Sequence, residues 1–460
     1  MNRKAKALYS LTAAVTICLL IVLSVSAQTA VSDQQITEKV NEYMDAAVKV
    51  EGFSGSILVA RNGKPIVSKG YGMANIELGV KNTPETVYLL GSVTKQFTGM
   101  AIAMLQERGK LSVDDPLCKF VDDCPKIWEP ITVKHLLTHR SGIKNYTDLP
   151  NFAKTAMVPM TTSEMTEFLK PIPLDFVPDE KNSYSNSGYF MLGVVIEKAS
   201  GKTYAGFLED NIFTPLGMKN SGYDDPLRII KNRASGYTRQ AGKMNNAAYL
   251  DMSLPYAAGS LYSTTGDLLL WDQALYTEKL VSKKSLDEIF TPSKSGYGYG
   301  WGIGKRFEHR TISHGGGIFG FSTNITRFPD DNVVVVVLTN IQGSPAGRVS
   351  NDLAAIVFGA KYEIPKERVS VAVDRKILET YTGKYQIKEP NLLITISIED
   401  GTLVGDLSGI AKFGLLAESE SKFFSKDAPV TVTFNKDAEG KVSGLTFVQG
   451  GAVLPAAKIE

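Results

Sequence analysis

The residues best suited to chemistry are three serines that each precede a lysine by three positions. They are Ser92 with Lys95, Ser141 with Lys144, and Ser419 with Lys422. On a helix this spacing puts a hydroxyl and an amine on one face, where the amine could activate the hydroxyl as a nucleophile. Only the first pair opens a long apolar segment, which predicts Ser92 at the positive end of a helix dipole and Lys95 in a low dielectric. Ser92 is therefore the candidate nucleophile.

A serine nucleophile needs a base, and an unperturbed lysine cannot serve as one. Its reference pKa of about 10.4 keeps the amine protonated at neutral pH, so desolvation or a second titratable group must shift it. Tyrosine suits this role because its reference pKa is close. Tyr184-Ser185-Asn186 is the only Tyr-x-Asn sequence in the chain and lies in a polar loop before a predicted helix. The alternative interpretation is turn chemistry, which Asn and Ser favour.

A third candidate segment is His314-Gly315-Gly316-Gly317, just before an apolar run. Consecutive glycines allow a ligand to approach the backbone closely. Of the four histidines, only His314 has a glycine two positions later. The alternative is a bulge at the start of a strand.

Two other hydrolase classes have weaker support. His135 and His139 stand four residues apart and could share a helical face in a metal site. The zincin pattern requires Glu after the first histidine, and this chain has Leu136, so packing and turn stabilisation are the favoured roles. No Gly-x-Ser-x-Gly sequence occurs, which disfavours an α/β-hydrolase. We therefore expect no metal.

Apolar periodicity predicts the elements that must position these groups. Helices are expected over 37–48, 94–108, 133–138, 188–199 and 264–275. Asn62-Gly63 between two apolar runs predicts a hairpin, and the Val and Leu run at 333–338 predicts a central strand. The pattern indicates an α+β fold, an antiparallel sheet flanked by helices whose first and last strands meet.

The N-terminus predicts a secretory signal peptide at residues 1–27. Basic residues precede an apolar run at 13–25 that ends in Val-Ser-Ala. The run is shorter than the roughly 20 residues that span a bilayer, so no stable membrane span is expected after cleavage. The protein is predicted to be exported, to the periplasm or the extracellular space. Without the basic residues of the signal the chain is nearly neutral, which argues against nucleic acid as a partner.

Two cysteines, Cys118 and Cys124, remain after signal removal and lie close together in sequence. In an exported protein they could form a disulfide, and two free thiols are the alternative. Closing so short a loop would contribute only about 2 kcal/mol to stability.

Composition divides the mature chain into three parts. Residues 28–362 contain the candidate site, and 363–374, with Pro365 and five charged residues, form a predicted linker. Residues 375–460 carry short alternating segments separated by turns such as Asp400-Gly401. They predict a small all-β domain, a meander or barrel.

The three candidate segments, in this order, resemble the serine hydrolases that share the β-lactamase and DD-peptidase fold. The resemblance is in particular to the branch with class C β-lactamases, D-aminopeptidases and related esterases. The resemblance extends to Ile-Thr-Val-Lys-His-Leu-Leu-Thr-His-Arg-Ser-Gly at 131–142 and Leu-Tyr-Ser-Thr-Thr-Gly-Asp at 261–267, and so spans roughly residues 35–362. It implies a β-lactamase/transpeptidase-like fold and an acyl-enzyme mechanism on small-molecule or peptide substrates, without a cofactor. The C-terminal segment resembles domains appended to some of these enzymes.

The resemblance also implies roles for individual residues. Ser92 would form the acyl-enzyme, and Lys95 and Tyr184 would share the base and acid roles. Asn186 would hold Lys95 and a substrate amide. The oxyanion hole would be the N–H groups of Ser92 and Gly317, beside Gly316.

The third segment departs from the penicillin-binding pattern, because His314 replaces a lysine and Gly315 replaces a hydroxyl residue. Relatives use those groups to bind a substrate carboxylate. We therefore favour an esterase, D-aminopeptidase or DD-peptidase-like hydrolase over a class C β-lactamase. If cationic His314 binds anions, turnover of carboxylate substrates should decline relative to neutral esters as pH rises through about 6.5. A catalytically silent sensor or scaffold is the other alternative, which the intact set of Ser92, Lys95 and Tyr184 argues against.

Overall fold

The computed structural model describes residues 31–150, 152–240, 243–388, 391–408, 411–426, 430–449 and 452–460. The predicted signal peptide at 1–27 lies outside the described residues. Within the described ranges, no helix combines the length and the apolar character needed to cross a bilayer.

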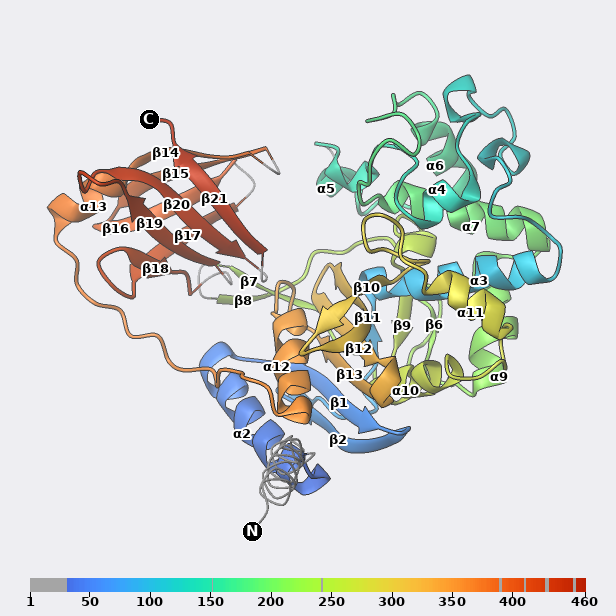
Figure 1. Ribbon diagram of the computed structural model, residues 1–460, viewed down its shortest axis with the longest axis horizontal. Helices are drawn as coiled ribbons and strands as arrows, with labels where there is room; N and C mark the ends of the chain where they lie inside the picture. Colours follow the sequence, from blue (N-terminus) through green and yellow to red (C-terminus); the bar gives the residue numbers. More distant parts are fainter. Residues whose placement is uncertain are drawn as a thin grey trace, which may run out of the picture.

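A six-stranded antiparallel sheet forms the centre of the large domain (Figure 1). Its strands, in spatial order, are β10 Gly302–Arg306, β11 His309–Ile318, β12 Phe321–Phe328, β13 Val333–Thr339, β1 Gly55–Arg61 and β2 Lys64–Tyr71. The predicted hairpin joins β1 to β2, and its turn residues Asn62 and Gly63 both have positive φ, as a type I′ turn requires. β1 pairs with β13 along its whole length, so the first and last strands meet.

Each face of this sheet packs against helices. α2 Asp33–Glu51 and α12 Ala346–Phe358 cover one face, and α3 Thr94–Glu107 and α10 Thr265–Ala274 lie on the other (Figure 1). β13 serves both cores, because alternate side chains of a strand point to opposite faces. Val335 and Val337 pack in the α2–α12 core, and Val334, Val336 and Leu338 pack in the other core. The continuous valine run is thus a strand buried on both faces.

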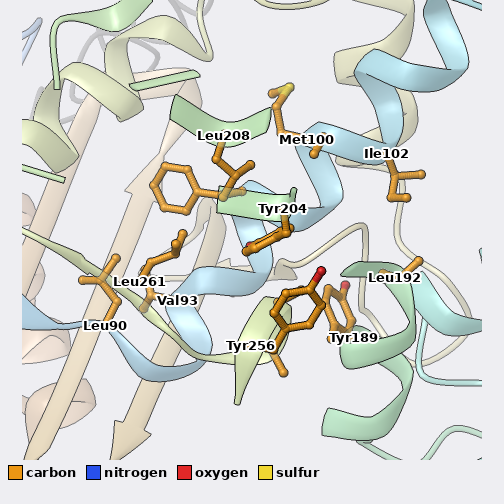
Figure 2. Close-up of a cluster of buried hydrophobic side chains, with 14 of the residues drawn as sticks. Leu90, Val93, Met100, Ile102, Tyr189, Leu192, Tyr204, Leu208, Tyr256 and Leu261 are labelled. Carbon is orange, nitrogen blue, oxygen red and sulfur yellow. The ribbon is translucent and has the colours of Figure 1, made fainter. Parts of the chain in front are cut away.

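The helices beyond the sheet pack around α3, which is buried over nearly its whole length, as its sequence predicts. In Figure 2, Val93, Met100 and Ile102 of this segment lie near side chains from α7, α8 and the turn η6. The helices of this region are α4 Val133–Leu137, α5 Phe152–Thr155, α6 Thr162–Leu169, α7 Asn186–Ser200, α8 Tyr204–Leu208, α9 Thr214–Leu216 and α11 Lys283–Ile289. A disulfide joins Cys118 to Cys124 in the segment before α4.

Shorter elements complete the large domain. They are β3 Met73–Asn75 paired with β4 Val80–Lys81, β7 Tyr237–Gln240 paired with β8 Lys243–Asn246, the sheet of β5 Tyr88–Leu89, β9 Leu261–Ser263 and β6 Gly222–Tyr223, and the turns η1 Gly91–Val93, η2 Leu117–Lys119, η3 Lys126–Trp128, η4 Tyr146–Asp148, η5 Glu209–Phe213, η6 Tyr256–Ala258 and η7 Pro329–Asp331.

The C-terminal part is a closed barrel of the described strands β14 to β21, with its own hydrophobic core. The strands are β14 Gly383–Ile387, β15 Leu392–Glu399, β16 Thr402–Leu407, β17 Ala411–Ala417, β18 Lys422–Phe424, β19 Val430–Lys436, β20 Val442–Gln449 and β21 Ala452–Lys458, preceded by α13 Arg375–Tyr381. An extended segment connects it to the large domain (Figure 1). In this segment Arg368 donates to Thr431 Oγ1 at 2.9 Å, so its second half lies against the barrel.

Candidate active site

Ser92 lies in the short turn η1 that leads directly into α3. The turn depends on Gly91, whose φ is +57° and whose Cβ, if present, would lie 2.9 Å from the carbonyl oxygen of Gly317. Glycine tolerates this left-handed conformation and the close approach. Ser92 itself is only partly buried. Its hydroxyl is therefore held at a helix N-terminus while keeping access to solvent.

Lys95 lies one helical turn after Ser92 and is completely buried. Its Nζ is 3.2 Å from Ser92 Oγ and donates to Asn186 Oδ1 and to the carbonyl oxygen of Ala258, each at 2.8 Å. Burial lowers the pKa of the amine well below its ordinary value, because desolvation disfavours the charged form. Low dielectric thus supplies the perturbation that a lysine base requires.

Tyr184 approaches Ser92 from the loop before α7, and its Oη donates to Ser92 Oγ at 2.7 Å. The residue is 40% exposed, but protein surrounds its hydroxyl end. Desolvation raises the pKa of the phenol, and the hydrogen bond with Ser92 only partly opposes this shift. The phenol therefore keeps its proton at neutral pH.

Asn186, the first residue of α7, follows the helix cap Ser185. Besides accepting from Lys95, its side chain donates to Thr147 Oγ1 at 3.2 Å, and its backbone N–H donates to Asn145 Oδ1 at 3.0 Å. These contacts fix the amide orientation. The structure thus brings Ser92, Lys95 and Tyr184 together with Asn186.

The glycines of β11 pack directly behind η1, the nucleophile turn, which carries the candidate nucleophile Ser92. A Cβ on Gly316 would lie 2.0 Å from the carbonyl oxygen of Leu90 and 2.3 Å from Thr323 Oγ1, whereas Gly317 has open space at that position. Thr323 Oγ1 also donates to the Leu90 carbonyl at 2.7 Å. Only glycine lets β11 come this close, and the backbone of Gly317 is thereby set beside Gly91.

One edge of β11 is free next to this turn. In the described part of the chain, β10 pairs with β11 only as far as Ser313, and the register of β11 with β12 continues to Ile318. The backbone of the His-Gly-Gly-Gly segment is therefore open on the side opposite β12.

The pKa of His314 lies below its reference value of about 6.5. Its Nδ1 lies 2.6 Å from the carbonyl oxygen of Gly315, and its Nε2 lies 2.8 Å from Tyr297 Oη. Since a carbonyl can only accept, Nδ1 carries the proton and Nε2 accepts from Tyr297. Desolvation, together with the charge of Lys95 whenever its amine is protonated, lowers the pKa of His314 to about 4, although the side chain keeps some solvent contact. We therefore expect any change in substrate preference that depends on His314 at a lower pH than 6.5.

The alternative metal site is not assembled. α4 ends at Leu137, so His139 lies beyond the helix, with φ of 56°. His135 Nδ1 accepts from the N–H of Thr132, and His139 Nδ1 accepts from the N–H of Ser185. The two rings do not share a helical face. In the described ranges, no group of three or more His, Cys, Asp or Glu side chains could hold a metal ion.

The other two Ser-x-x-Lys pairs have local structural contacts. Ser141 is buried and accepts from the N–H of Ile143, while Lys144 pairs with Asp175. Ser419 accepts from the N–H of Lys422 in the barrel.

Sequence reasoning missed three contributors to the site. The carbonyl of Ala258 carries no sequence signal, because any residue has one. Tyr297 and Thr147 come from loops whose positions could not be derived. Tyr297 does lie in an alternating Gly-Tyr stretch, Gly-Tyr-Gly-Tyr-Gly at 296–300, which was the one available signal.

Comparison with known proteins identifies the family. The Beta-lactamase family model matches residues 40–359, and a second model, a domain of unknown function (DUF3471), matches residues 367–454. The chain belongs to the beta-lactamase family. The resemblance and the fold class predicted from the sequence, including the separate all-β domain, are confirmed.

Three relatives illustrate the range of the family. A penicillin-binding protein of Bacillus subtilis (strain 168) is 28% identical over 428 residues, covering 86% of this chain and 93% of its own length. The teichoic acid D-alanine hydrolase of Staphylococcus aureus (strain NCTC 8325 / PS 47) is 28% identical over 318 residues, covering 68% and 76%. The octameric penicillin-binding protein homologue from Pyrococcus abyssi superposes with a TM-score of 0.65 at 26% identity, covering 91% and 99%.

Proposed function

We propose that this protein is an exported serine hydrolase that cleaves D-aminoacyl esters or amides through an acyl-enzyme. The observation that carries the proposal is the position of Ser92 Oγ, 2.7 Å from the phenol of Tyr184 and 3.2 Å from the amine of Lys95. One hydroxyl thus lies between a group suited to accept a proton and a group suited to donate one.

Lys95 is the base of the proposed acylation step. A neutral amine has two N–H groups and one lone pair, and the contacts around Lys95 match this count. The N–H groups donate to Asn186 Oδ1 and the carbonyl of Ala258, which leaves the lone pair for the hydroxyl proton of Ser92. The lowered pKa of the amine supports the neutral form.

Tyr184 is the acid of the same step. Ser92 Oγ bonds to the substrate carbonyl carbon as its proton moves to Lys95, and the bond to the leaving group then breaks. The leaving group takes the proton of Tyr184, and the proton held by Lys95 restores the phenol. Water hydrolyses the acyl-enzyme in a second cycle. The raised pKa of Tyr184 supports this role because the phenol holds its proton until the leaving group needs it.

The N–H groups of Ser92 and Gly317 are the proposed oxyanion hole. The close packing of β11 on the nucleophile turn supports this assignment. One such donor typically contributes about 3 kcal/mol to transition-state stabilisation. The free edge of β11 supports a substrate backbone lying alongside it, with Asn186 at the other side.

The substrate class follows from what the third segment lacks. His314 is neutral and Gly315 has no hydroxyl, so the groups that bind a substrate carboxylate in penicillin-binding relatives are absent. One relative is a teichoic acid D-alanine hydrolase, whose name describes removal of a D-alanyl group. Both points favour a D-aminoacyl ester or amide over a β-lactam.

Intact mass spectrometry of the purified protein tests this function. We expect D-alanine methyl ester to leave a D-alanyl adduct on Ser92 and to be hydrolysed faster than the L-enantiomer, and Ser92→Ala to show neither effect. Turnover of benzylpenicillin without any D-alanyl adduct would instead support a β-lactamase, whereas a stable benzylpenicillin adduct would support a DD-peptidase-like hydrolase. No adduct and no turnover with any of these compounds would support the silent scaffold. The same mass reports export, because cleavage after Ala27 removes residues 1–27.

A further inference from the structure

His139 holds the backbone on both sides of Tyr184. Its carbonyl oxygen accepts from the N–H of Ser183 at 2.9 Å, and its ring Nδ1 accepts from the N–H of Ser185 at 3.1 Å. A single residue therefore binds the two amides that flank the phenol. The left-handed backbone of His139, with φ of 56°, is a conformation that side chains other than glycine rarely adopt and that surrounding contacts must maintain.

The ring of His139 also packs on the ring of Tyr184. The two centroids are 4.4 Å apart, and the rings of Tyr297 and Tyr189 lie 4.6 Å and 5.0 Å away. Tyr189 is itself fixed by donating to the carbonyl of Leu137 at the end of α4. His139 is only 2% exposed, so this aromatic cluster has little freedom to move.

The tautomer of His139 follows from these contacts. Because Nδ1 accepts a hydrogen bond, the neutral ring carries its proton on Nε2, which finds no hydrogen-bond partner among the described residues. Leaving a buried N–H without a partner is costly, so packing alone would favour a phenylalanine here. The Nδ1 acceptor is the property that phenylalanine lacks.

We propose that His139 is a positioning residue whose Nδ1 sets the Ser185 amide, and with it the phenol of Tyr184, in line for proton transfer to the leaving group. This inference rests on the proposed function. Tyr184 is most needed when the leaving group is a poor one, such as an amine, and least needed for p-nitrophenolate, which departs without a proton. The loss of activity that follows from poor positioning should therefore depend on the leaving group. A general loss of folding would lower the rates for all leaving groups equally.

Two variants separate the acceptor from the ring. His139→Phe keeps an aromatic ring and removes the acceptor, whereas His139→Asn keeps an acceptor at a similar position and adopts the left-handed backbone readily. We expect His139→Phe to lower kcat for D-alanine amide about 30-fold with little change in KM, and to lower kcat for a D-alanyl p-nitrophenyl ester less than about threefold. His139→Asn should recover most of the amide activity. His135→Asn, on the neighbouring helix, is the matched control and should leave both rates near wild type.

A double-mutant cycle completes the test. If His139 acts through Tyr184, adding His139→Phe to Tyr184→Phe should change the amide rate less than about twofold. Equal losses on both substrates, or full additivity with Tyr184→Phe, would overturn the proposal. If His139→Phe does not fold, as judged by its melting temperature, an amide rate for His139→Asn as low as that of Tyr184→Phe would also overturn it. The wild-type rates test the proposed function separately. If the wild-type protein hydrolyses neither substrate, the proposed function is wrong, whatever the variants show.

Discussion

At the residue scale, burial gives two ordinary side chains complementary roles. Desolvation favours the neutral form of every titratable group, so it lowers the pKa of Lys95 and raises that of Tyr184. The same physical cause thus favours a neutral amine and a protonated phenol on either side of one hydroxyl, as the proposed base and acid roles require. Neither group needs a charged partner for this effect.

The first prediction concerns His314 and carboxylate substrates. Because the pKa of His314 is about 4, the ring stays neutral at higher pH and gains its positive charge only as pH falls through that value. The ratio of kcat/KM for a carboxylate-bearing substrate to that for a neutral ester should therefore be constant from about pH 5.5 to 8. Parallel pH profiles measure it.

Tyr297→Phe is the informative variant for this prediction. The variant removes the hydroxyl that donates to His314 Nε2. Loss of this hydrogen bond destabilises the neutral ring and so raises the pKa of His314. Any rise in the ratio as pH falls should therefore begin at a higher pH than in the wild type. A wild-type ratio that falls with a midpoint near pH 6.5 would contradict the assignment.

Much of the candidate site could be predicted from residue types and order, and some of it could not. Ser92, Lys95 and Tyr184 are predictable because side-chain chemistry limits which residues can fill such roles. The lowered pKa of His314 was not predictable, since it depends on burial and on the nearby Lys95, whose proximity to His314 no spacing rule identifies. The contact of Lys95 with the Ala258 carbonyl was equally invisible, because backbone groups are the same at every position.

At the element scale, local patterns predict elements better than they predict contacts. The hairpin at Asn62-Gly63, the buried helix after Ser92 and the strand of valines all follow from turn chemistry and apolar periodicity. The helix starts predicted at 94 and 133 are confirmed, but those predicted at 37 and 188 were late, because the caps Ser32 and Ser185 precede the apolar positions on which periodicity depends. The packing of β11 on the nucleophile turn is a long-range contact that no local pattern encodes.

The second prediction tests this contact with Gly316→Ala. The added Cβ would lie 2.0 Å from the carbonyl oxygen of Leu90, so β11 must move away from the nucleophile turn. We expect kcat/KM to fall about 100-fold, the loss typical of a missing oxyanion donor. Gly304→Ala on β10 is the control, since its Cβ has an ordinary 3.5 Å contact with Thr311 Oγ1. An active Gly316→Ala enzyme would show that activity does not depend on this close packing of β11.

At the scale of the whole molecule, the two domains have separate hydrophobic cores. The barrel core and the two cores of the large domain share no residue. Alternating segments predicted the all-β domain but did not distinguish a meander from a barrel. Closure depends on pairing between β14 and β21, at opposite ends of the domain, which alternation does not specify.

The third prediction is that the two domains unfold in separate transitions. The disulfide should affect only the transition of the large domain, which contains it. All three tryptophans, Trp128, Trp271 and Trp301, lie in the large domain, so their fluorescence reports only that domain, whereas circular dichroism reports both. Replacing Cys118 and Cys124 by serine should cost about 2 kcal/mol and lower the fluorescence transition by a few degrees. The barrel transition should not move. A single shared transition would show that the domains unfold together.

The pairing of β1 with β13 has a consequence for the order in which the molecule is built. The strand that begins at Gly55 pairs locally with β2 but finds its second partner at Val333–Thr339, and such distant pairing is slow because a long loop must close first. A growing polypeptide therefore presents Ser92 well before β11 and β13 have been synthesised. The packing of β11 on the turn that carries Ser92, and with it the candidate site, can therefore form only after this later part of the chain has been made.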